Sequence, residues 1–121
     1  MNMTLQKVTL ANGESITYRE RAGGKQILVL VHGNMTSSKH WDVLMDTLDD
    51  SFTVIALDMR GFGGSTYHTR VNGIKDFSND LKNFVDHLSL KKFDLIGWST
   101  GGAVCMQFVA DFPGYCEKLV L

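Results

Sequence analysis

Residues 93–102 read FDLIGWSTGG, and this stretch decides the fold. Its first half is a short apolar run typical of a buried strand, and the apolar segment 101–112 that follows suits a helix ended by Pro113-Gly114. A G-x-S-x-G motif lies between them, with Ser99 at its centre. A serine on a sharp turn from strand to helix has a strained backbone, and side chains at the flanking positions would collide with the neighbouring strand and helix. The pattern therefore predicts a strand, a tight turn and a helix, whereas a serine that only caps a helix beside packing glycines is the plainer alternative.

The rest of the chain alternates strands with helices around this turn. Residues 27–31 are continuously apolar, as expected for a parallel strand covered on both faces, and residues 52–57 repeat this pattern with one threonine. Residues 119–121 begin another strand. Residues 41–48 and 77–88 carry apolar side chains at helical spacing. Segment 101–112 is apolar on nearly every side, which predicts a helix buried against the sheet. The order predicts an α/β fold with a doubly wound, mostly parallel sheet.

The N-terminal part of the chain predicts an antiparallel start to this sheet. Apolar residues alternate with polar ones at Val8 and Leu10, and again at Ile16 and Tyr18. Between them lies Asn12-Gly13, a pair that tolerates the positive φ values of a type I′ turn. We therefore expect a β-hairpin with a tight turn.

Composition excludes several classes of protein. The length of 121 residues suits one domain. With 44% hydrophobic residues and a net charge of -1, the composition is that of an ordinary soluble protein. Its positive charge is too low for binding to nucleic acid. Residues 1–6 do not have the pattern of a signal peptide, and the apolar runs fall far short of the ~20 residues of a membrane helix, so we expect a cytoplasmic location.

Cys105 and Cys116 are expected to be two buried free thiols, since neither zinc nor redox spacing is present.

A second motif, residues 32–35 (HGNM), directly follows the strand 27–31. A loop in this position can direct a backbone N–H at a substrate carbonyl oxygen, and we expect Asn34 to supply that donor. Thr100, just after Ser99, would supply the second donor of an oxyanion hole, helped by the positive end of the helix dipole. The Asn34 side chain contacts substrate or stabilises the loop, and His32 is expected to order the loop by hydrogen bonds rather than act as the general base.

With these residues in place, the sequence resembles the α/β-hydrolase superfamily. The HG pair at 32–33, the D-x-R-G-x-G-x-S segment at 58–65 and the elbow at Ser99 stand in the family's order. The resemblance implies an eight-stranded sheet with about six strands present, so residues 1–121 would be the N-terminal part of a single core domain, without its cap and C-terminal strands. It also implies the triad order Ser, acid, His, with the acid and histidine beyond Leu121. In that pattern Asp58 shapes the Gly-rich turn beside Arg60.

Other residues have modest expected roles. The turn 61–64 lacks the lysine and spacing of a phosphate-binding loop, no metal-ligand cluster is evident, and we expect no cofactor. The other histidines, His40, His68 and His87, are expected to be solvated or to pack. Trp98 and Met35 flank the site and either line a substrate pocket or pack in the core.

The resemblance also bears on the chemistry. The loop 33–38 is similar to that of haloalkane dehalogenases, which, like epoxide hydrolases of this fold, use an aspartate nucleophile. Ser99 stands at that position here, which implies acyl transfer from a small-molecule acyl substrate to serine and hydrolysis of the acyl-enzyme. Carboxylesterases, carbon–carbon bond hydrolases and acyltransferases share these motifs, and a non-catalytic receptor or interaction protein of the fold is a further alternative. Without its general base, the 121-residue chain is expected to turn over little substrate.

Overall fold

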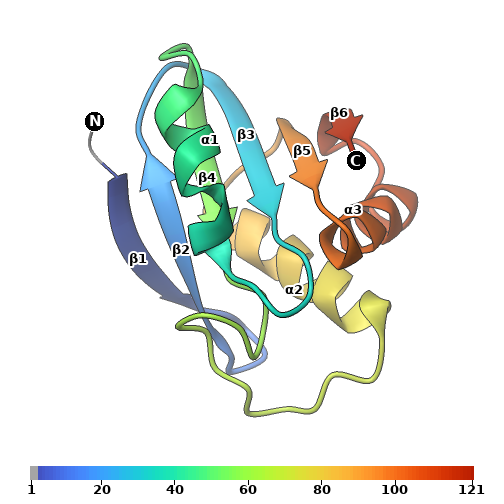
Figure 1. Cartoon of the computed structure of the whole chain (residues 1–121). Helices are drawn as coiled ribbons and strands as arrows, with labels where there is room; N and C mark the ends of the chain where they lie inside the picture. The colour runs from blue at the N-terminus through green and yellow to red at the C-terminus, as the bar shows by residue number, and fades with distance from the viewer. Residues whose placement is uncertain (1–2) are drawn as a thin grey trace.

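The computed structural model describes residues 3–121, so the first two residues of the segment 1–6 lie outside the described part. A six-stranded sheet runs through it in the order β1-β2-β4-β3-β5-β6 (Figure 1). β3 pairs in parallel with β4 and β5, and β5 with β6, whereas β2 is antiparallel to β1 and β4. The predicted mostly parallel sheet with an antiparallel start is confirmed. The strands are β1 (Met3–Thr9), β2 (Ser15–Arg21), β3 (Gln26–Val31), β4 (Phe52–Leu57), β5 (Phe93–Gly97) and β6 (Cys116–Val120).

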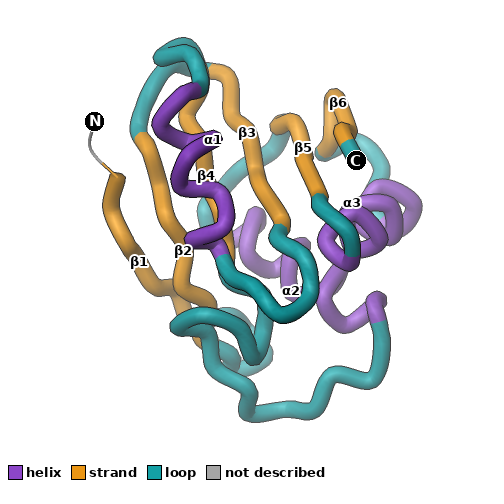
Figure 2. Tube along the Cα trace, viewed as in Figure 1, coloured by secondary structure: helices purple, strands orange, loops and turns teal. Residues whose placement is uncertain are grey.

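Helices cover both faces of this sheet, as Figures 1 and 2 show. A 3₁₀ turn, η1 (Ser38–Trp41), and the short helix α1 (Asp42–Thr47) lie on one face. The other face packs against α2 (Ile74–His87) and α3 (Thr100–Asp111). The fold is therefore a three-layer α/β sandwich, and the connections at the carboxyl ends of β3 and β5 carry the predicted motifs.

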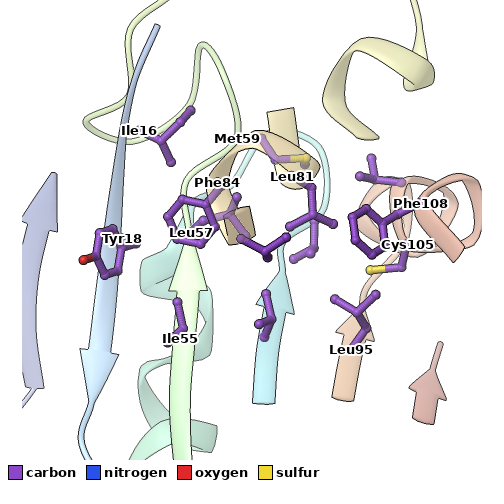
Figure 3. Close-up of a cluster of buried hydrophobic side chains, with 14 of the residues drawn as sticks. Ile16, Tyr18, Ile55, Leu57, Met59, Leu81, Phe84, Leu95, Cys105 and Phe108 are labelled. Atoms are coloured by element: carbon purple, nitrogen blue, oxygen red, sulfur yellow. The ribbon is translucent and has the colours of Figure 1, made fainter. Parts of the chain in front are cut away.

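The alternation of side chains along each parallel strand explains the two hydrophobic clusters. Successive residues of a strand point to opposite faces, so a continuously apolar strand supplies both clusters. Val29 and Val31 of β3 pack against α2 and α3, whereas Leu28 and Leu30 pack toward α1. Figure 3 shows the larger cluster, in which Phe84 of α2 and Phe108 of α3 meet side chains from the sheet.

The hairpin turn differs from the prediction. Gly13 has a φ of +88°, but Asn12 is not among the residues with positive φ, so the turn is not type I′. Instead the loop holds three residues, with hydrogen bonds from Gly13 N to Leu10 O (3.0 Å) and from Leu10 N to Glu14 O (2.7 Å). This is the longer hairpin loop in which one glycine supplies the only left-handed residue. The side chain of Asn12 accepts a hydrogen bond from the backbone N–H of Glu14 within the loop, and its amide donates to Asp80.

The burial of α3 and of the thiols is also less complete than predicted. α3 buries one side only, and Met106 on its outer side is 50% exposed. Cys105 faces the core, and its burial raises the pKa of the thiol to about 12, with a smaller contribution from Cys116. Cys116 is only partly buried, and both thiols are unpaired. No helix within residues 3–121 has the length and apolar character needed to cross a lipid bilayer.

Candidate active site

Ser99 lies in the two-residue connection between β5 and α3 and has a strained backbone conformation. Its φ of 57° and ψ of -119° are rare for a residue with a side chain, and such a conformation costs on the order of 1–3 kcal/mol. The surrounding turn holds it there through hydrogen bonds from Gly101 N to Trp98 O and from Gly102 N to Ser99 O, both 2.9 Å. The side chain is exposed at the carboxyl edge of the sheet. The strand, tight turn and helix predicted around Ser99 are present.

The glycines on either side of Ser99 are sterically required. A Cβ at Gly101 would lie 2.2 Å from the carbonyl oxygen of Val31 and 2.4 Å from that of His32. A Cβ at Gly97 would lie 2.6 Å from the carbonyl oxygen of Gly101. These neighbours are backbone atoms that cannot move away cheaply. The first turn of α3 therefore lies directly against the end of β3.

This close approach brings the two predicted motifs together. The Trp98 backbone N–H donates to the Val31 carbonyl over 3.2 Å, and a Cβ at Gly33 would lie 2.4 Å from Cε3 of the Trp98 ring. The indole therefore packs on the backbone of the HG loop, while 48% of Trp98 stays exposed. Asn34 is exposed next to it, and Met35, with a φ of 62°, is 89% exposed.

His32 is fully buried and uses both ring nitrogens within the fold. Nε2 accepts a hydrogen bond from the backbone N–H of Met59 (2.9 Å), which places the ring proton on Nδ1, where it donates to the carbonyl of Gly33 (2.7 Å). Burial lowers the pKa of the imidazole, and the opposing effects of the Gly33 carbonyl and the Asp58 carboxylate are smaller. A neutral ring with both nitrogens engaged orders the loop, as predicted, and has no free nitrogen for a serine proton.

The backbone N–H groups of Asn34 and Thr100 are the two predicted oxyanion donors. Asn34 follows Gly33 on the HG loop, and Thr100 is the first residue of α3. Within residues 3–121, neither backbone N–H donates to an acceptor, and the amides at a helix N-terminus have no partner inside the helix. Such donors are suited to an anionic oxygen.

Asp58 stabilises the loops around the site. Its buried carboxylate accepts hydrogen bonds from the backbone N–H of Ser38 (2.6 Å) and from the hydroxyl of Thr17. Gly63, with a φ of +53°, allows the Gly-rich turn to fold over this carboxylate, since a Cβ there would lie 2.4 Å from Cγ of Asp58. Asp58 therefore has the structural position implied by the resemblance.

Sequence reasoning missed a buried ionic cluster behind this turn. Arg60 binds Asp80 of α2, and Glu14 from the hairpin lies 4.0 Å from Arg60. Glu14 accepts hydrogen bonds from the hydroxyl of Thr66 (2.6 Å) and from the backbone N–H groups of His68 and Thr69. Burial tends to raise the pKa of Glu14, but these hydrogen bonds and Arg60 outweigh it and lower the pKa to about 2. No local pattern could reveal a cluster whose members lie so far apart in the sequence.

A second contact missed from the sequence joins His40 to Trp98. Their rings stack with centroids 4.7 Å apart and an interplanar angle of 16°. Because both residues are at least partly exposed, hydrophobic periodicity gave no reason to pair them.

Comparison with known proteins places the fold and the motifs in one family. The family model of the alpha/beta hydrolase fold matches residues 26–121. The chain belongs to the α/β-hydrolase fold family. The match begins at β3 and includes the HG loop, the Gly-rich turn and the Ser99 turn.

Several relatives of this α/β-hydrolase chain are named as hydrolases. The chain is 32% identical over 125 residues to 2-hydroxy-6-oxo-2,4-heptadienoate hydrolase of Pseudomonas putida. This alignment covers 100% of the chain and 45% of the relative. The chain is equally similar to the human serine hydrolase BPHL, with 99% of the chain and 43% of that protein covered. Among solved structures, the epoxide hydrolase CorEH without ligand superposes with a TM-score of 0.91 at 32% identity, covering 98% of the chain and 41% of that structure. The chain spans less than half the length of the relatives described here.

Proposed function

We propose that this protein is a serine hydrolase that cleaves an ester or a related acyl bond through an acyl-enzyme on Ser99. One observation carries the proposal. Ser99 has a φ of 57° at an exposed turn between a buried strand and a helix, in a chain of the α/β-hydrolase family. Strain of this kind persists where the surrounding structure fixes it, and at such a turn it holds a hydroxyl out toward substrate.

In the proposed mechanism Ser99 Oγ attacks the acyl carbonyl while a histidine takes its proton. The N–H groups of Asn34 and Thr100 stabilise the oxyanion that forms, and water then releases the acid from the acyl-enzyme. No histidine follows Ser99 in the 121 residues, and both nitrogens of His32 are engaged. We therefore place the acid and the histidine of the triad after Leu121 in the whole protein, following the family's order. Trp98 and Met35 border the acyl group in this arrangement.

A second candidate is hydrolysis of a carbon–carbon bond beside a ketone. It is favoured by the similarity of the entire chain to a relative named for an oxo-heptadienoate substrate. The similarity to an epoxide hydrolase does not make epoxide hydrolysis a candidate function. In the family pattern epoxide hydrolases have an aspartate nucleophile at the position that Ser99 occupies here. A serine is the nucleophile of acyl transfer.

Hydrolysis of a short-chain nitrophenyl ester by the whole protein tests the proposal. Replacing Ser99 with alanine is expected to lower kcat by on the order of 10⁶-fold. Ser89→Ala is the matched control, since Ser89 is also an exposed serine with a positive φ (59°) but lies just after the C-terminus of α2. A wild-type rate in Ser99→Ala would overturn the proposal, and a folded wild-type protein without ester or ketone hydrolysis would favour the receptor alternative.

A further inference from the structure

The stack of His40 on Trp98 connects two segments that flank the candidate site. His40 lies in η1, and Trp98 directly precedes Ser99. The near-parallel rings, 4.7 Å apart at 16°, are in the range of favourable aromatic stacking. Within the described residues neither ring nitrogen of His40 makes a hydrogen bond, so the contact uses the face of the ring.

Trp98 is also held on another side. A Cβ at Gly33 would lie 2.4 Å from Cε3 and 2.7 Å from Cζ3 of the indole, so the ring touches the backbone of the HG loop. The indole therefore lies in contact with His40 and with the peptide that leads into Asn34. Movement of the indole would change the space available to that peptide.

His40 itself is carried on a fixed segment. The backbone N–H of Ser38 donates to the buried carboxylate of Asp58 over 2.6 Å, and the hydroxyl of Ser38 accepts from Arg19 over 3.2 Å. The His40 N–H donates to Ser37 O over 3.0 Å, which closes the turn. Because η1 is attached to the core through Asp58, His40 can support Trp98 from a stable position.

We propose that His40 is a positioning residue for the oxyanion hole, which holds the indole of Trp98 against Gly33 and so fixes the backbone N–H of Asn34 relative to Ser99. This inference rests on the proposed function. Displacement of a catalytic donor by about 1 Å can cost on the order of 10²-fold in rate, so a support of this kind affects catalysis without touching substrate.

Kinetics of ester hydrolysis by the whole protein test this role. His40→Ala is expected to lower kcat by roughly tenfold or more while KM changes by less than about twofold, because the donor serves the transition state. His40→Phe, which keeps a flat ring and removes the ring nitrogens, is expected to restore most of kcat. Lys39→Ala, at an exposed neighbour in η1, is the control and should match the wild type. Full activity in His40→Ala, or a His40→Phe enzyme as slow as His40→Ala, would overturn the inference.

A second measurement separates this inference from the proposed function. Amide resonances of Gly33 and Asn34 are expected to move in His40→Ala and to return in His40→Phe, whether or not Ser99 turns over an ester. Unchanged amide resonances in His40→Ala would overturn the inference. A wild-type protein without Ser99-dependent turnover would instead remove the proposed function, and the resonances would still decide whether His40 positions the loop.

Discussion

The guanidinium of Arg60 forms two hydrogen bonds with the carboxylate of Asp80, from Nε to Oδ2 at 2.8 Å and from Nη2 to Oδ1 at 2.7 Å. Nη1 of Arg60 donates to the carbonyl of Thr69 over 2.9 Å. The Asp80 hydrogen bond raises the pKa of Arg60, although burial opposes it. Through this pair, the turn after β4 is attached to α2 and to the long loop between them.

Removal of one partner of this buried pair should destabilise the fold strongly. Asp80→Ala leaves the Arg60 charge buried without its main partner, and we expect it to lower the free energy of unfolding by about 3–5 kcal/mol. Urea unfolding measures the change. Asp86→Asn on the same helix is the control, because Asp86 pairs with Lys82 with its side chain 42% exposed, and should cost about 1 kcal/mol or less. Equal losses in the two variants would show that the Arg60 pair has no special importance.

Glu14 should make the fold sensitive to acid. Its pKa of about 2 in the folded state lies below the unfolded value of about 4.3, so the folded state favours the carboxylate. The resulting stability, about 3 kcal/mol, is fully present above the unfolded pKa and is lost as the pH falls from about 5 toward 2. Unfolding free energies of the wild type and of Glu14→Gln should converge over this interval. Parallel curves for the two proteins would contradict the assignment.

Gly101 and Gly102 offer a matched test of the close approach between α3 and β3. Gly101→Ala places a methyl group against the carbonyls of Val31 and His32 and should destabilise the protein by at least about 2 kcal/mol. Gly102→Ala meets its nearest atom at 3.4 Å, and a helical alanine should leave stability unchanged or raise it by up to about 1 kcal/mol. Thermal or urea unfolding distinguishes them, and a harmless Gly101→Ala would disprove the steric argument.

The ring of His32 should be neutral at pH 7 with its proton on Nδ1. Since burial lowers its pKa, stability contributed by this ring is present above the unfolded pKa of about 6.5 and declines as the pH falls below it. Nitrogen chemical shifts of the imidazole report the tautomer directly. A proton on Nε2 would be incompatible with the hydrogen bond from Met59.

The sequence predicted what depends on local pattern. The strands β3, β4 and β5 are covered on both faces, and their apolar runs therefore predicted parallel strands. The glycines beside Ser99 are required because a Cβ at either position would clash with backbone atoms, and the G-x-S-x-G motif shows this requirement in the sequence. His32 was correctly expected to order its loop, because its position directly after a buried strand leaves the ring inside the fold.

Features set by distant residues were not predictable in this way. The turn at Asn12 differs from the expected type, and the side chain of Asn12 donates to Asp80, 68 residues away in the chain. The outer face of α3 is apolar yet partly exposed, and periodicity does not show which apolar face is covered. The contact of His40 with Trp98 likewise depends on how η1 lies relative to the Ser99 turn.

Reaction of the whole protein with a fluorophosphonate tests the central claim most directly, since this reagent forms a stable adduct with an activated serine hydroxyl. Mass spectrometry of the digested protein is expected to find the adduct on Ser99 and to find none in Ser99→Ala. A folded wild-type protein that acquires no adduct at Ser99 would contradict the account.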